Sequence, residues 1–95
     1  MPLETFPYDS AELLDTPDAV AAYLEAAFET DDPAFITKAL GVVARAKGMT
    51  QIAKDAGLSR ESLYRALGEN GNPEFSTVLK VAKALGLRLA VVAAE

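Results

Sequence analysis

The chain has 95 residues, contains neither cysteine nor histidine, and has a net charge of −5. This length suits one domain, spanning residues 1–95, with a single core. The composition excludes disulfides, thiolate metal sites and histidine-based catalysis, so we expect no enzyme. The start, MPLETFPYDS, lacks a secretory pattern, and no apolar run reaches the roughly 20 residues that span a bilayer, so we expect a cytoplasmic protein.

The charges are divided unevenly along the chain. Residues 1–32 contain nine acids and no basic residue, whereas residues 33–95 contain all nine basic residues and five acids. This asymmetry indicates two surfaces with different partners, a basic surface for DNA and an acidic surface for a basic molecule. The alternative for the acidic part is that acids favour helix N-termini and solubility.

The first elements are an arm and a helix. Residues 1–16 have apolar side chains without a helical period, so we expect an N-terminal arm there. Thr16-Pro17 predicts a helix start, because proline is tolerated at the first helical position, and the helix should run to about Glu29. Its apolar residues form one stripe at Val20, Tyr23, Leu24, Ala27 and Phe28.

Asp32-Pro33 repeats this start signal, and Gly48 is expected to end the second helix. Gly41 lies inside this helix, where it should cost about 1 kcal/mol relative to alanine. A close helix crossing at Gly41 is the expected reason. The apolar stripe consists of Ile36, Ala39, Leu40, Val43 and Ala44.

Residues 49–67 predict two short helices joined by a tight turn at Gly57, with Ser59 capping the second helix. Apolar residues fall at the positions that must face inward if the two helices cross steeply. The outward side chains of the second helix can reach phosphates and base edges. This pattern resembles the helix-turn-helix of the lambda-repressor-like regulators, with residues 60–67 as the recognition helix. An ordinary helical hairpin is the alternative.

The C-terminal part predicts one more helix and a strand. Asn72-Pro73 is a third start signal, and the helix should stop at Gly86. Residues 87–92 alternate as in a short strand, which would pair with the arm or with its twin in a second subunit. The expected buried residues of the helix are Phe75, Val78, Leu79, Ala82 and Leu85, and the expected dimer contacts of the strand are Leu87, Leu89 and Val91.

Several stretches together resemble the addiction-module antidote proteins, small helix-turn-helix antitoxins that partner RelE-like toxins. The resemblance covers about residues 15–92 and is most specific in GLSRESLYRAL, residues 57–67, together with Gly71-Asn72-Pro73. It implies a DNA-binding antitoxin that represses its own operon. Thr50-Gln51 departs from the wider lambda-repressor-like pattern, since it lies two residues closer to Ala53 than usual, which puts the usual phosphate contact of Gln51 in doubt.

The predicted fold is therefore all-α, a lambda-repressor-like bundle of about five helices with a short C-terminal β-strand. Within it, Arg60 lies near the helix end that enters the major groove and can bond guanine. Arg65 lies about 140° around the axis and is expected at a phosphate. The candidate DNA contacts are Thr50, Gln51, Ser59, Arg60, Glu61, Ser62, Tyr64, Arg65 and Asn70.

Two of these residues have alternative roles. Tyr64 is either a contact to phosphate or a thymine methyl, or a core aromatic. Glu61 either accepts from cytosine or simply faces the helix dipole. The acids Asp15, Asp18, Asp31 and Asp32 form no evident octahedral set, so we expect neither a metal nor a cofactor.

Three functions fit these features. The first is an antitoxin that binds a RelE-like toxin and, as a homodimer, its operator DNA, with Glu25 and Glu29 as candidate toxin contacts. The second is a stand-alone repressor without a toxin partner. The third is an interaction module that has lost DNA binding. The acidic N-terminal third favours the first over the second, because a toxin that acts on mRNA should itself be basic.

Overall fold

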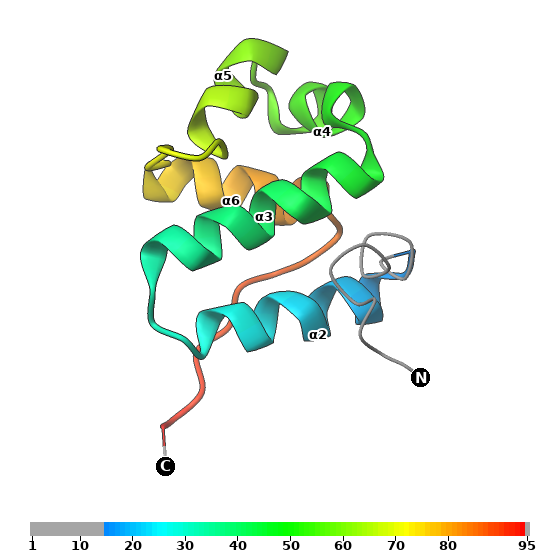
Figure 1. The fold of residues 1–95 in the computed structure, drawn as a ribbon. Helices are drawn as coiled ribbons and strands as arrows, with labels where there is room; N and C mark the ends of the chain where they lie inside the picture. The colour runs from blue at the N-terminus through cyan, green and yellow to red at the C-terminus, as the bar shows by residue number, and fades with distance from the viewer. Residues whose placement is uncertain (1–14, 95) are drawn as a thin grey trace, which may run out of the picture.

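A computed structural model describes residues 15–94, which form a bundle of α-helices (Figure 1). The helices are α2 (Pro17–Phe28), α3 (Pro33–Lys47), α4 (Met49–Ala56), α5 (Arg60–Ala66) and α6 (Phe75–Ala84). Within the described residues there are thus five helices and no strand, which confirms the all-α prediction. None of these helices is long and apolar enough to cross a membrane.

Helix α2 lies at one end of the molecule and α4 and α5 lie at the other, with α3 and α6 between them (Figure 1). Helix α3 packs on both α2 and α4, and α4 in turn packs on α5 and α6. The core lies where these helices meet, and its largest fully buried side chains come from four of them: Val20, Leu40, Val43, Leu63 and Val81. Burial of α5 through Leu63 is necessary because seven residues are too few for a stable isolated helix.

The starts of α2 and α3 follow the predicted capping. The Thr16 hydroxyl accepts from the Ala19 N–H at 3.1 Å, and Pro17 occupies the first helical position. The Asp32 carboxylate accepts from the Ala34 N–H at 3.0 Å, again just before a proline. Each cap satisfies a backbone donor that the helix leaves unpaired. Of the predicted arm, only Asp15 and Thr16 lie within the described residues.

Two glycines set the turns around α4. Gly48 lies between α3 and α4 with a φ of 110°, and Gly57 follows α4 with a φ of 73° in the left-handed region. The Leu58 N–H donates to the Ala53 carbonyl at 2.8 Å, which closes the turn after Gly57. Side chains other than glycine rarely adopt this backbone conformation.

A close approach is present at Gly41, but to the residue that ends α5 rather than to a helix crossing α3. Gly41 is buried, and a Cβ atom there would lie 2.9 Å from the Leu67 carbonyl oxygen, which follows α5. The absence of a side chain on α3 therefore lets the end of α5 come close to it.

Helix α6 differs from the prediction at its start and in its buried face. Its N-cap is Glu74 rather than Asn72, because Glu74 is still extended, with a ψ of 156°. The prediction that Phe75 and Leu79 are buried was wrong, since they are 70% and 42% exposed. The prediction is confirmed at Ala82 and Leu85, which are buried, and Val81 is buried as well. The core-facing side of α6 is thus shifted from the predicted stripe, so that Val81 is buried in place of Phe75 and Leu79.

The C-terminal strand predicted at residues 87–92 is not formed within the described chain. A strand needs a neighbour for its backbone groups, and residues 15–94 contain no other strand. Leu87 instead packs against the core of its own chain. Its N–H donates to the Ala82 carbonyl at 2.9 Å, around Gly86 with a φ of 81°. Pairing of this segment with a second subunit stays a prediction.

Candidate functional site

Helix α5 and the turn before it hold most of the predicted site residues. The Ser59 hydroxyl accepts from the Ser62 N–H at 3.0 Å, which confirms the predicted cap. Leu63 anchors the helix in the core with no exposed surface. With one face fixed in this way, the remaining side chains of the helix must face outward.

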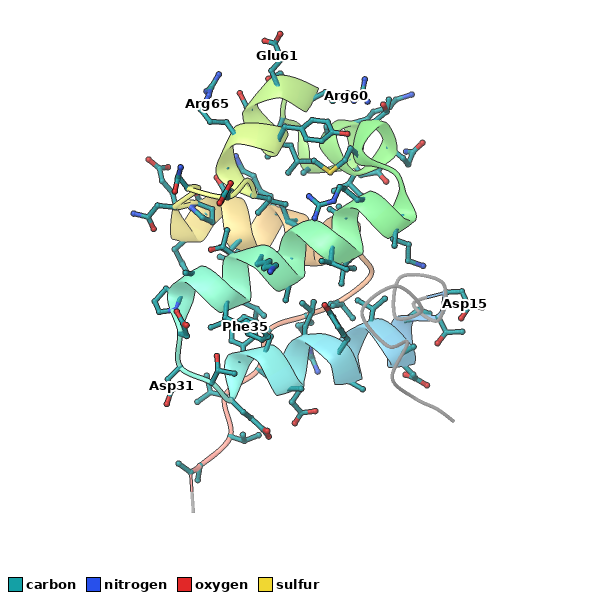
Figure 2. The ribbon with its side chains drawn as sticks, in the orientation of Figure 1. Asp15, Asp31, Phe35, Arg60, Glu61 and Arg65 are labelled. Carbon is teal, nitrogen blue, oxygen red and sulfur yellow. The ribbon has the colours of Figure 1, made fainter. Side chains whose placement is uncertain are left out.

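Three charged side chains project from α5 into solvent. Arg60, Glu61 and Arg65 all point away from the body of the molecule at the end opposite α2 (Figure 2). The guanidinium groups lie on different sides of the helix, as their spacing predicts. A planar guanidinium is the group that best matches the fork of acceptors on guanine or phosphate.

Tyr64 does not have the alternative core role, and its contact to DNA stays a prediction. Its side chain is 41% exposed, so it is not a core aromatic. The Arg60 Cζ lies 5.3 Å from the centroid of the Tyr64 ring, and the Arg60 Nη2 is 3.5 Å from the tyrosine hydroxyl. Such an exposed cation–π contact is worth only about 0.5–1 kcal/mol. The Tyr64 ring therefore restricts the Arg60 side chain to one position, but the contact is weak enough to be broken.

The smaller polar groups come from α4, from α5 with its N-cap, and from the loop after α5. Ser59 donates its hydroxyl hydrogen to the Ser62 Oγ at 2.8 Å, so the hydroxyl hydrogen of Ser62 remains available for another acceptor. In α4 the Gln51 Nε2 donates to the Asp55 Oδ1 at 2.9 Å, which occupies part of its amide. Thr50 and Asn70 are exposed. Thr50 and Gln51 come from α4, whereas Asn70 comes from the loop after α5.

The acidic candidates lie on another element. Glu25 and Glu29 are exposed, one turn apart at the end of α2, and Asp18 is exposed in its first turn. Because α2 and α5 lie at opposite ends of the fold, the acidic surface and the α5 surface are separate (Figures 1 and 2). Within the described part of the chain, no group of three or more acids is arranged to hold a metal ion.

The three dimer contacts predicted at the C-terminus differ in their exposure. Leu87 is half-buried in its own core, whereas Leu89 and Val91 are 40% and 99% exposed. Of the predicted set, only Leu89 and Val91 thus remain largely accessible to a second subunit.

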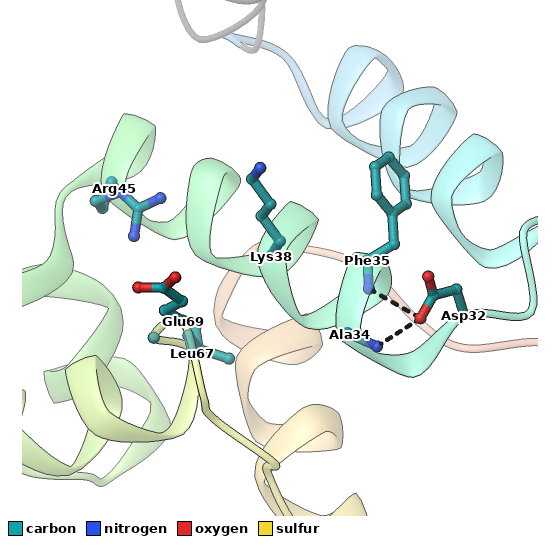
Figure 3. A pocket seen from close by; sticks show the side chains of 8 residues that line it. Asp32, Ala34, Phe35, Lys38, Arg45, Leu67 and Glu69 are labelled. Carbon is teal, nitrogen blue, oxygen red and sulfur yellow. Dashed lines mark hydrogen bonds between the residues drawn. The ribbon is translucent and has the colours of Figure 1, made fainter.

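A groove that the sequence did not reveal lies between α3 and the loop after α5 (Figure 3). Its walls include Phe35, Lys38 and Arg45 from α3, with Glu69 opposite them. The feature of the sequence that could have indicated this groove is Phe35, an aromatic residue outside the buried stripe of its helix. In the structure its side chain is 48% exposed. Acids and bases are balanced along the groove, so it has no preference for phosphate.

Comparison with known proteins places the chain in a family. Residues 4–93 match the family described as "Probable addiction module antidote protein", which confirms the resemblance found in the sequence. A protein of Haemophilus influenzae, named "Uncharacterized protein", is 49% identical over 84 residues, covering 88% of this chain and 87% of that protein. No solved structure matches the chain significantly. The chain therefore belongs to the family of probable addiction module antidote proteins.

Proposed function

We propose that this protein is a DNA-binding antitoxin of the cytoplasm, which neutralises a RelE-like toxin by direct binding and represses its own operon. In this proposal α4 and α5 form a helix-turn-helix, and α5 is the recognition helix. The observation that carries the DNA-binding part is the set of charged side chains on α5, which face solvent at the end opposite α2 (Figure 2). Membership of the antidote family supports the antitoxin part.

The proposed reading of DNA begins with Arg60. In the free protein its guanidinium rests over the Tyr64 ring, at 5.3 Å. This contact is worth only about 0.5–1 kcal/mol, so it leaves Arg60 able to form a bidentate bond to guanine, which discriminates against a wrong base by about 1–3 kcal/mol. Once Arg60 has moved, the Tyr64 hydroxyl is free to bond a phosphate, or its ring to contact a thymine methyl. Arg65 lies on another side of the helix and contacts a phosphate of the DNA backbone.

The neighbouring polar groups fix the position of the helix on the DNA. The Ser62 hydroxyl hydrogen is free to donate to a phosphate, because its oxygen already accepts from Ser59. Thr50, Gln51 and Asn70 come from segments on either side of α5 and supply further phosphate contacts. Glu61 accepts from a cytosine amine or faces the helix dipole. The phosphate contacts among these determine register rather than sequence preference.

The toxin-binding part of the proposal rests on α2. Its exposed carboxylates, including Glu25 and Glu29, are not neutralised by any basic residue within residues 1–32. A toxin that acts on mRNA is expected to be basic, since it must approach phosphate, and an acidic helix complements it. Because α2 and α5 lie at opposite ends, one molecule can hold toxin and DNA together.

Two assays test the proposal. In the first, the purified protein is titrated onto the DNA that precedes its own gene and onto a scrambled duplex of equal length. Preferential binding to the upstream DNA is expected, and equal or absent binding contradicts the repressor role. In the second, the protein is co-expressed with a RelE-like toxin whose expression alone stops growth. Rescue of growth is expected. DNA binding without rescue would identify a stand-alone repressor. Rescue without DNA binding would identify an interaction module.

The proposal also requires two copies of the chain on the operator. One recognition helix covers about half of a site, and regulators of this type place two helices roughly 34 Å apart, one turn of DNA. A homodimer is therefore part of the proposed function, and Leu89 and Val91 are its predicted contacts at the C-terminus.

A further inference from the structure

The segment after α6 has the composition of a strand but no strand beside it. Residues 88–94 are all exposed, and Arg88 is their only charged residue. The backbone of this segment forms no hydrogen bond with any other described residue. Its two adjacent β-branched side chains, Val91 and Val92, are 99% and 84% exposed. An apolar segment with unpaired backbone groups is a template for pairing with another chain.

The fold places this segment beside the acidic end of α2. Leu87 fixes its start, because this side chain packs against the core. From there the segment runs past the loop between α2 and α3 (Figures 1 and 3). Three acids, Glu29, Asp31 and Asp32, are exposed at this loop. The unpaired backbone and the acidic surface are therefore neighbours.

The toxin contact proposed on α2 lacks an apolar part. Glu25 and Glu29 supply charge, but charges at an interface mainly raise the association rate and the specificity. Stable binding also needs buried apolar area and paired polar groups. The exposed residues Ala22 and Ala26 of the same helix are small and offer little of that area. Residues 89–94, beside the end of this helix, offer both apolar side chains and unpaired backbone groups.

We propose that residues 88–94 bind the toxin as an added β-strand, on the exposed edge of a sheet in the toxin. In this mode the backbone N–H and C=O groups of the segment pair along that edge, and its side chains alternate between the two faces of the sheet. Basic residues of the toxin beside the edge meet Glu29, Asp31 and Asp32. The inference rests on the proposed function and deepens it, since it names the part of the toxin that is recognised.

The charges around the segment favour a basic protein as its partner. The neighbouring acids complement a basic surface, and membership of the antidote family implies a toxin as partner. A strand has two hydrogen-bonding edges, because the N–H groups of alternate residues point to opposite sides. Pairing with a second subunit along one edge, as predicted for residues 87–92, therefore leaves the other edge for the toxin.

The test is a proline scan of the full chain, read as the dissociation constant for a purified RelE-like toxin that the wild type neutralises. Each proline removes one backbone N–H donor. Ala90→Pro and Val92→Pro remove donors from one edge, and Val91→Pro and Ala93→Pro remove donors from the other. We expect both members of one pair to weaken binding about tenfold or more, and both members of the other pair to stay within about twofold of the wild type.

The two pairs are matched controls for each other, since each contains one alanine and one valine. Ala90→Ser and Ala93→Ser keep the N–H group and should bind as the wild type does. Every change lies outside the helices, so circular dichroism and the unfolding temperature should stay those of the wild type.

Three outcomes overturn the inference. Wild-type binding by all four proline variants excludes the segment from the contact, and equal loss in all four shows contact without strand pairing. Loss of binding on reversal of Glu25 and Glu29 to lysine, with no effect of the prolines, overturns this inference alone and leaves the toxin contact on α2. A wild type that binds no toxin overturns the toxin part of the proposed function and this inference with it.

Discussion

The cap of α5 offers a sharp test of how the structure holds this helix in place. The Ser59 Oγ accepts from the Ser62 N–H at 3.0 Å and donates to the Ser62 Oγ at 2.8 Å. Ser59→Ala removes both bonds, and loss of an N-cap costs about 1 kcal/mol, within a range of about 0.5–2 kcal/mol. For a domain of this size, about 1 kcal/mol lowers the Tm by about 4–8 °C.

Two further substitutions at this position separate stability from DNA binding. Ser59→Asn keeps a capping oxygen and should unfold close to the wild-type temperature, with operator binding largely kept. Ser59→Asp also keeps the cap, but it adds a negative charge beside the phosphate proposed at Ser62 and should weaken DNA binding. Ser62→Ala is the matched control for stability, since it removes a hydroxyl but leaves the cap, and it should weaken DNA binding through the lost phosphate contact.

The assays are thermal unfolding followed by circular dichroism and titration of fluorescent DNA by anisotropy. Ser59→Ala should unfold several degrees below the wild type, and Ser62→Ala should fall between the two. Unfolding of Ser59→Ala at the wild-type temperature would refute the reasoning. Equal destabilisation by Ser59→Ala and Ser59→Asn would also refute it, because the asparagine oxygen should replace the serine oxygen.

Three further predictions follow from burial, backbone conformation and charge. Gly57→Ala should lower the free energy of unfolding by about 1–2 kcal/mol in a denaturant titration, because its φ of 73° is unfavourable for alanine; an unchanged value would contradict this. Leu63→Ala should cost about 2–5 kcal/mol, since the side chain has no exposed surface; a loss below 1 kcal/mol would mean that α5 is not anchored there. The reversal of Glu25 and Glu29 to lysine should abolish growth rescue in co-expression with the toxin while the unfolding temperature stays within a few degrees of the wild type. Full rescue by this variant would remove α2 from the toxin contact.

Local signals in the sequence predicted the helix ends best. Thr16 and Asp32 are caps because their side chains bond backbone groups only two or three residues away, and Gly57 adopts a left-handed conformation that its own residue type allows. Such interactions depend on neighbours in the chain, so a single sequence reveals them. The predicted cap at Ser59 is confirmed for the same reason.

Features that depend on distant partners were predicted less well. In α6, Ala82 and Leu85 are buried as predicted, but packing on α4 buries Val81 in place of Phe75 and Leu79. The start signal at Asn72-Pro73 shows where a helix can begin, whereas packing set the start two residues after Pro73. The alternation of residues 87–92 is likewise local, but a strand needs a partner elsewhere, and residues 15–94 offer none.

The candidate site was predictable in its residues but not in its contacts. That Arg60 and Tyr64 share one side of α5 follows from their spacing of four. Their stacking at 5.3 Å, and the bond between Gln51 and Asp55, depend on side-chain conformations that spacing alone does not specify. The groove beside Phe35 required the fold, because its two walls come from α3 and from the loop after α5.

The central claim, that α5 reads DNA, is tested most directly by comparing Arg60→Ala with Arg65→Ala on the upstream DNA and on a scrambled duplex. Arg60→Ala should lose about 1–3 kcal/mol of binding free energy on the upstream DNA and little on the scrambled duplex. The variant should also lose the preference for one base pair of the upstream DNA. Arg65→Ala should weaken both duplexes about equally and make the salt dependence shallower. Lys38→Ala, on α3, is the control and should bind as the wild type does. Binding of Arg60→Ala to both duplexes with wild-type affinity would show that α5 is not the reading helix.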